Sequence, residues 1–180
     1  MAEEQSEETK MEARQFMADL VSSAPRSKDF TGGDGIDMAS WKTTYAASSS
    51  STAMEKLWSM YDPSASSIWT MSYDEAEDNE HLDETIAISK DFMKLTESIS
   101  DHCFGVMHTV GENLDIKGLW IFNGPDPEKL FSVNEDSSWF TWSELGPEAN
   151  DYVKKAVAEF LTPVDGKLKG DTIKDTQVFA

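Results

Sequence analysis

An α+β fold, in which helices flank an antiparallel β-sheet, is what this sequence predicts, and three observations support it. Two apolar runs, 103–110 and 114–122, are joined by Gly111-Glu112-Asn113, a short glycine-containing connection typical of a β-hairpin. A continuous apolar stripe at helical spacing runs through residues 152–161. Strand and helix patterns do not alternate as they do in βαβ units, which favours α+β over a parallel α/β sheet.

The N-terminal part, residues 1–36, is predicted to form an acidic helix followed by a linker. Apolar residues recur at helical spacing over about 5–23, and Pro25 ends this pattern. Three glycines within 32–35 mark the linker. The remaining residues, 37–180, are predicted to form one folded domain with this helix as an extension.

Two helices open this domain in the sequence-based interpretation. The first covers about 37–46, and the serine tract 48–51 after it is interpreted as a flexible joint. Thr52 and Glu55 have the spacing of a capping box, which predicts that the second helix starts there. Asp62-Pro63 should end this second helix, because proline cannot continue it.

The middle of the chain contains the β-prone segments. A strand is predicted over 66–73, a solvated acidic loop over 74–84, and a helix over about 88–99. The hairpin strands within 103–122 are apolar on both faces, so we expect them to be central and covered on both sides. A further strand is predicted over 139–145.

The last helix of the predicted domain is bounded by prolines. Pro147 is expected to open it and Pro163 to end it. The segment 164–180 is interpreted as irregular apart from a short apolar finish at Val178-Phe179.

The net charge is the most unusual bulk property. The chain has 34 acidic and 15 basic residues, for a net charge of -19. Such a surface repels the phosphates of nucleic acids and the headgroups of anionic lipids, so neither is an expected partner. Other proteins with basic surfaces are the expected partners, although the charge could also serve only solubility.

Cysteine usage and the N-terminal sequence bear on the cellular compartment. One cysteine, Cys103, allows neither an intramolecular disulfide nor a cysteine-based zinc site. The acidic start has the features of neither a secretory signal nor a transit peptide, and no run reaches the ~20 apolar residues of a membrane span. We therefore expect a cytoplasmic protein.

Residues for catalysis, cofactors or metals do not form a recognisable pattern. His102 and Cys103 are neighbours, and neighbours in a strand point to opposite faces, which argues against a nucleophile–base pair. His108 is interpreted as a hydrogen-bonded core histidine. The glycines within 32–35 lack the spacing of a phosphate-binding loop, and the acids of 74–84 lack the EF-hand pattern. The sequence predicts no enzyme, no cofactor and no metal.

Aromatic residues are the best candidates for contacts with a partner. Tryptophan and tyrosine are enriched in protein-binding clefts, because their polar edge can stay in water while the ring is buried. Most of the aromatic side chains should belong to the core, but some could line a cleft. The candidates are Trp58, Trp69, Tyr73, Trp120 and Trp142.

These same residues carry a resemblance to the C-terminal domain of translation elongation factor 1-gamma. Trp58–Asp62, then Ser67–Trp69 and Tyr73, resemble its aromatic W-x-x-(F/Y)-D…S-x-W…Y segment. Gly118–Gly124 is similar to its G-(V/L)-(W/F)-(V/I)-F-(R/N)-G strand, and Trp142–Leu145 to its W-x-K-L position. Phe104-Gly105 and Gly111-Glu112 resemble its first hairpin strand and turn.

The sequence also departs from this family pattern. Glu144 stands where the family usually has lysine, and the usual basic terminus is replaced by Gln177–Ala180. The family normally carries a glutathione-transferase-like domain ahead of this one, whereas here only the predicted acidic helix precedes it. We therefore expect either a divergent, stand-alone relative without that domain or an isolated domain of a longer subunit.

The resemblance implies a non-catalytic interaction or scaffold domain with an antiparallel sheet, flanking helices and an aromatic-lined cleft. Its setting would be a translation elongation complex, in which the family's subunit scaffolds nucleotide exchange, or a repurposed assembly. The alternative is a small-molecule-binding domain that uses the aromatic cleft. Fold transfers between relatives more safely than function does.

Overall fold

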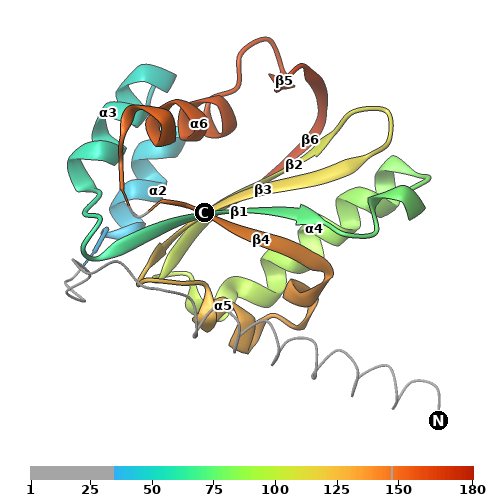
Figure 1. Ribbon diagram of the computed structural model, residues 1–180, viewed down its shortest axis with the longest axis horizontal. Helices are drawn as coiled ribbons and strands as arrows, with labels where there is room; N and C mark the ends of the chain where they lie inside the picture. The colour runs from blue at the N-terminus through green and yellow to red at the C-terminus, as the bar shows by residue number, and fades with distance from the viewer. Residues whose placement is uncertain (1–34, 147) are drawn as a thin grey trace.

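The computed structural model describes residues 35–146 and 148–180. The predicted N-terminal helix and most of its linker lie outside the described residues, as does Pro147. The described part confirms the α+β prediction: one antiparallel sheet of six strands is packed against five α-helices (Figure 1). None of the described helices is long and apolar enough to cross a membrane.

The sheet has the strand order β4-β1-β3-β2-β6-β5. Neighbouring strands are antiparallel throughout, and β2 with β3 forms the predicted hairpin at its centre. The strands are β1 (Ser66–Tyr73), β2 (Cys103–Val110), β3 (Asp115–Asn123), β4 (Phe140–Gly146), β5 (Lys167–Leu168) and β6 (Asp171–Phe179).

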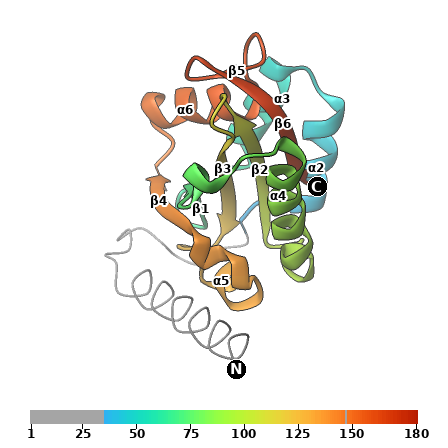
Figure 2. The same cartoon turned by 90° about the vertical axis from the view of Figure 1, so that its right-hand side faces the viewer.

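The helices cover the two faces of the sheet in separate groups (Figure 1). On one face lie α2 (Met38–Ala47), α3 (Ser50–Met60) and α6 (Asp151–Leu161). On the other lie α4 (Leu82–Thr96) and α5 (Glu128–Val133). Figure 2 shows α6 and β5 at one end of the molecule and α5 at the other.

Each face has its own hydrophobic core, and the alternation of strand side chains divides the residues between the two. Phe104 and Val106 of β2 point toward α2 and α3, whereas Cys103 and Met107 point toward α4. Every residue of β2 is buried, which confirms that the hairpin strands are central and covered on both sides.

The start of α3 differs from the prediction. The helix begins at Ser50 with Ser49 as its N-cap, and Ser48 caps the end of α2, so the serine tract joins the two helices directly and the predicted flexible joint was wrong. The amide of Ala53 already donates to the carbonyl of Ser49 at 2.8 Å. Thr52 therefore lies in the first turn, and its hydroxyl accepts from Ser49 Oγ at 3.0 Å instead of capping the helix.

Two other helix boundaries also differ from the prediction. The acidic segment 74–84 is shorter as a loop than predicted, since it contains a 3-10 turn at Ala76–Asp78 and α4 starts within it at Leu82. The last helix begins at Asp151, where Asn150 Oδ1 accepts from the Val153 amide at 2.9 Å. The asparagine side chain thereby satisfies a free helical N–H, which a proline side chain, having no acceptor atom, does not do.

The C-terminal segment was the largest error of the sequence-based prediction. Residues 171–179 form β6, which pairs with β2 and extends the sheet, and are not irregular. The strand consists mainly of polar residues, and most of its side chains are exposed or half-buried. It therefore lacks the alternation of apolar and polar residues from which a strand is predicted. The backbone hydrogen bonds between β6 and β2 stabilise a strand that the composition of this segment does not predict.

Candidate functional site

The five predicted aromatic candidates are not brought together in a common cleft of the described residues. Trp69, Tyr73, Trp120 and Trp142 lie on the α4 and α5 side of the sheet, and Trp58 lies on the opposite side. Trp120 is fully buried, and Trp69 and Trp142 are 6% and 9% exposed. These three rings therefore contribute mainly to the core.

Their packing explains why they are buried. The Trp120 ring lies 5.6 Å from that of Phe92 and 5.5 Å from that of Phe179, measured between centroids. Trp142 packs edge-on against Phe131 at 5.3 Å, and its Nε1–H donates to the carbonyl of Ser137 at 3.1 Å. Aromatic pairs at such distances and angles stabilise a core beyond their buried area.

Trp58 and Tyr73 are half-buried, so part of each ring faces solvent. Trp58 packs against Tyr61 with centroids 5.7 Å apart, and the ammonium of Lys154 lies 5.7 Å from its centroid. Tyr73 contacts Phe140 at 5.3 Å. Because they are on opposite faces, a single small partner could not contact both, and their role in binding stays a prediction.

The histidines and the cysteine have structural surroundings. His108 is buried, and its two ring nitrogens lie 2.8 Å from Thr176 Oγ1 and 2.8 Å from the carbonyl of Phe160. Burial lowers its pKa, which favours the neutral ring, and the hydrogen bond to the Phe160 carbonyl acts in the opposite direction. The predicted hydrogen-bonded core histidine is thereby confirmed.

Cys103 is fully buried, and burial raises the pKa of its thiol to about 12. A thiol that stays protonated is a poor nucleophile. Burial lowers the pKa of His102 to about 4, with nearby Lys129 acting in the same direction. Within residues 35–146 and 148–180, no group of three His, Cys, Asp or Glu side chains is placed to hold a metal ion.

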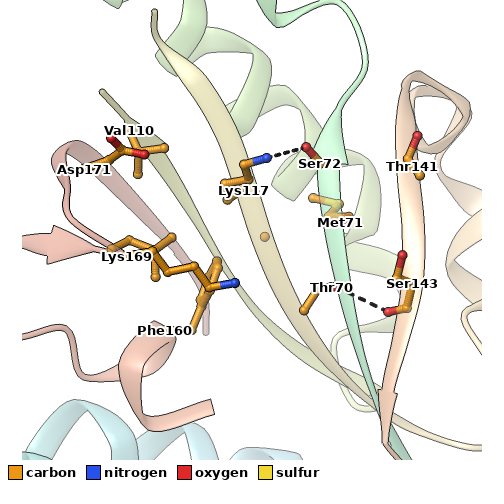
Figure 3. Close-up of a pocket in the computed structure, with 12 residues that line it drawn as sticks. Thr70, Met71, Ser72, Val110, Lys117, Thr141, Ser143, Phe160, Lys169 and Asp171 are labelled. Carbon is orange, nitrogen blue, oxygen red and sulfur yellow. Dashed lines mark hydrogen bonds between the residues drawn. The ribbon is translucent and has the colours of Figure 1, made fainter. Parts of the chain in front are cut away.

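A hollow on the α6 side of the sheet is the site that sequence reasoning missed (Figure 3). It has a volume of about 350 Å³ and is lined by residues of β1, β3 and β4 together with Phe160 of α6. This volume lies within the roughly 300–1,000 Å³ range of small-molecule pockets. We call it the sheet groove.

Hydroxyl side chains form one wall of the sheet groove. Thr70 and Ser72 of β1 lie directly opposite Ser143 and Thr141 of β4, so the four share one face of the sheet. We refer to these four residues as the hydroxyl ladder. A signal for it existed in the sequence, because Thr70-Met71-Ser72 and Thr141-Trp142-Ser143 both place hydroxyls at alternate strand positions, with the large apolar side chain between them on the opposite face.

Two lysines reach the sheet groove, one from a strand and one from a turn. Lys117 Nζ donates to Ser72 Oγ at 2.8 Å and forms an ion pair with Asp115 at 3.0 Å. Lys169 lies in the turn between β5 and β6, and its side chain extends over Phe160 toward Thr70 (Figure 3). Its ammonium has no hydrogen-bond or ion-pair partner in the part of the chain that the structure describes.

The opposite charge collects at the tip of the hairpin and the segment before α4. Asn79 Nδ2 donates to the carbonyl of Leu114 at 2.8 Å, which ties this segment to the hairpin. We call the exposed carboxylates there the acidic end: Asp74, Glu75, Glu77, Asp78, Glu80, Asp83, Glu84 and Glu112. A hollow of about 590 Å³ lies among them and is lined in part by Glu77 and Glu112.

Comparisons with known proteins agree with this architecture. The family model described as "Elongation factor 1 gamma, conserved domain" matches residues 26–126. Elongation factor 1-gamma 2 of Oryza sativa subsp. japonica is 28% identical over 135 residues, which is 71% of this chain and 32% of that protein. Elongation factor 1-gamma of Prunus avium is 23% identical over 173 residues, which is 90% of this chain and 40% of that protein. The chain thus spans about a third of the length of the curated relatives it matches.

Proposed function

The chain belongs to the elongation factor 1-gamma conserved-domain family, and from this membership we propose that it is a non-catalytic protein-interaction domain. The observation that carries the proposal is the family match, which extends over more than half of the chain. The proposed setting is a translation elongation complex or an assembly derived from one, in the cytoplasm. The buried thiol and the hydrogen-bonded His108 support a non-catalytic role.

The acidic end is the surface that we propose for the partner. Its carboxylates are exposed and fixed to the hairpin by Asn79, and they add to a net charge of -19. Such a surface attracts a protein with a basic patch and speeds its association at low ionic strength. It repels nucleic acids and anionic membranes for the same reason.

Co-purification with subunits of the elongation exchange complex tests this proposal, at about 50 mM and 300 mM salt. We expect retention at low salt and a marked loss at high salt, because exposed charges more than a Debye length apart are screened. A triple variant of the acidic end, Glu77→Lys, Asp78→Lys and Glu80→Lys, should abolish retention.

The matched control places the same charge change elsewhere. Glu55, Glu148 and Glu159 are exposed and lie in or next to α3 and α6, away from the acidic end. Replacing all three with lysine should weaken retention much less than the triple variant of the acidic end. Equal losses in the two triple variants would show that only the net charge matters and would contradict the proposed surface.

A second candidate function, small-molecule binding, is favoured by the sheet groove and not by the buried aromatic residues. Amide NMR shifts during titration with a panel of metabolites test it. Occupancy of the groove should shift the amides of the lining residues Thr70 and Ser143, whereas the Trp142 ring lies on the opposite face of the sheet. Unchanged amide shifts across the panel would count against this candidate.

A further inference from the structure

The sheet groove presents hydroxyl groups in a regular array. The hydroxyl ladder places two pairs of hydroxyl residues directly across β1 and β4. Thr70 and Ser72 are half-buried, whereas Thr141 and Ser143 are exposed. Thr141 Oγ1 donates to Asp74 at 2.5 Å and Thr70 Oγ1 to the Ser143 carbonyl at 3.4 Å, which leaves the hydroxyl protons of Ser72 and Ser143 for a ligand that is rich in oxygen.

Two ammonium groups flank this wall, and they differ in how they are held. Lys117 is fixed by Ser72 and Asp115, which neutralises much of its charge. Lys169 has a backbone φ of 50°, in the left-handed region, and precedes Gly170 at φ 88° in the tight β5–β6 turn. Figure 3 shows that this turn directs the Lys169 side chain across the groove. Lys169 therefore supplies a positive charge that the described residues do not neutralise.

The overall charge of -19 does not cancel this local positive charge. The Debye length at physiological ionic strength is about 8 Å, so exposed carboxylates farther away are largely screened. Among the residues that line the groove, Asp171 is the only acid, and it forms no ion pair with Lys169; Asp74, which does not line the groove, is hydrogen-bonded to Thr141. A ligand with an oxyanion would therefore meet a favourable local field.

The remaining wall is apolar. Val110 of β2, Phe160 of α6 and Leu168 of β5 line the groove behind the lysines. Phe160 and Leu168 are buried, at 8% and 6% exposure, so they form a fixed surface. A ligand that fits must combine an oxyanion with a compact apolar part, because ligand pockets use apolar contact for affinity and a few polar groups for orientation.

We propose that the sheet groove binds a small organic anion whose oxyanion lies between Lys169 and the hydroxyl ladder and whose apolar part rests on Phe160 and Leu168. Phosphate monoesters and carboxylates share this chemistry. The proposal gives the second candidate function a ligand class and does not depend on the protein-interaction function. Lys169 would donate charge-assisted hydrogen bonds, and Ser72 and Ser143 would donate neutral ones, since the Thr70 hydroxyl already donates to the Ser143 carbonyl at 3.4 Å.

Titration of the full chain with phenyl phosphate, benzoate and phenol, followed by isothermal calorimetry and by amide NMR shifts, tests the proposal. Phenyl phosphate or benzoate should bind and should shift the amides of Thr70, Ser143 and Lys169, and phenol should bind at least tenfold more weakly. Tighter binding of one anion over the other identifies the source as a phosphate ester or a carboxylic acid. If neither anion binds at millimolar concentration, or if shifts lie outside the groove, the proposal is wrong.

Variants sharpen this test. Lys169→Gln should weaken binding about tenfold or more, since a hydrogen bond to a charged group contributes about 1.5–3 kcal/mol. Lys155→Gln removes an exposed lysine of α6 that does not line the groove and should leave the affinity unchanged. Lys169 makes no intramolecular bond in the described structure, so its variant should keep the melting temperature of the unaltered chain. Equal affinities of the two variants would overturn the proposal.

The triple variant of the acidic end separates this site from the proposed protein-interaction surface. It should bind phenyl phosphate at least as well as the unaltered chain, because none of its substituted residues lines the sheet groove. A loss of partner retention with intact anion binding would confirm that the two sites are independent. A parallel loss of both would contradict a local groove site.

Discussion

The indole ring of Trp120 covers the Cα of Gly105 on the neighbouring strand. The two residues are directly paired across β2 and β3. A Cβ added to Gly105 would lie 2.2 Å from Cδ2 of Trp120, far inside van der Waals contact. The ring cannot move away, because Phe92 and Phe179 pack against it. The absence of a side chain at position 105 is thus what lets the largest buried ring of this core lie flat on the sheet.

Gly105→Ala should therefore destabilise the fold strongly. Forcing extra volume into a filled core costs about 1–3 kcal/mol of the free energy of unfolding. We expect a cost at the upper end of this range, because the added methyl group would meet the fixed Trp120 ring. The melting temperature should fall by roughly 6–12 °C for a loss of ~3 kcal/mol in the free energy of unfolding. Thermal unfolding followed by far-UV circular dichroism measures this change.

Gly118→Ala is the matched control on the same pair of strands. A Cβ there would meet Met71, at 2.8 Å from its Cγ and Cε. Methionine adapts its rotamer readily, so this variant should lose less free energy of unfolding than Gly105→Ala. A smaller loss in Gly105→Ala than in Gly118→Ala would contradict the role given to Trp120.

Asn123 joins the start of the described chain to the end of β3. Its Oδ1 accepts from the Ile36 amide at 2.8 Å and from Ser66 Oγ at 3.0 Å, and its Nδ2 donates to the Ile36 carbonyl at 2.7 Å. Asn123→Ala removes all three hydrogen bonds, which should lower the free energy of unfolding by about 2–4 kcal/mol. Urea denaturation followed by tryptophan fluorescence measures this loss.

Asn79→Ala provides the comparison for Asn123. The Asn79 side chain donates one hydrogen bond, to the carbonyl of Leu114, and it lies in a more open segment. Its replacement should cost no more than about 1 kcal/mol. Similar losses in the two variants would mean that the contact with Ile36 contributes little.

The sequence predicted those elements in which composition and burial agree. The hairpin of β2 and β3 and the strand β1 were correct to within a residue or two, because both carry apolar runs that central strands require. β6 was missed because its side chains are largely exposed and its stability comes from pairing with β2. Local sequence does not encode such pairing, which is settled by tertiary contacts.

The same reasoning explains what was missed at the candidate site. The sequence names aromatic residues as cleft candidates by residue type alone. Residue type does not distinguish a fully buried ring, such as that of Trp120, from an exposed one. The hydroxyl ladder depends on which strands are neighbours. The paired residues of β1 and β4 are distant in the chain, since Tyr73 lies opposite Phe140, 67 positions later. Lys169 comes from the turn between β5 and β6, at the opposite edge of the sheet from β4, so only the folded chain brings it to the same groove.

Tyr45 of α2 is hydrogen-bonded to the end of α6. Its hydroxyl donates to the carbonyl of Leu161 at 2.7 Å, and its ring packs against Phe104 at 5.1 Å. Tyr45→Phe keeps the ring and removes the hydrogen bond, so the free energy of unfolding should fall by about 0.5–1.5 kcal/mol. Tyr152→Phe is the matched control, since Tyr152 is 74% exposed and should change stability by less than about 0.5 kcal/mol. Chemical denaturation of both variants decides the comparison, and equal losses would contradict the role of this bond.

His102 should make the fold less stable as the pH falls from about 6.5 to about 4. Burial lowers the pKa of this imidazole to about 4 in the folded chain, whereas an unperturbed histidine has a pKa of about 6.5. Between these values the unfolded chain binds a proton that the folded chain does not, so protonation favours unfolding. His102→Gln should therefore reduce the loss of stability over this pH range, and His81→Gln, at an exposed position, should not. Urea midpoints measured at pH 7, 5.5 and 4.5 show the difference between the variants, and parallel pH profiles for His102→Gln and the unaltered chain would contradict it.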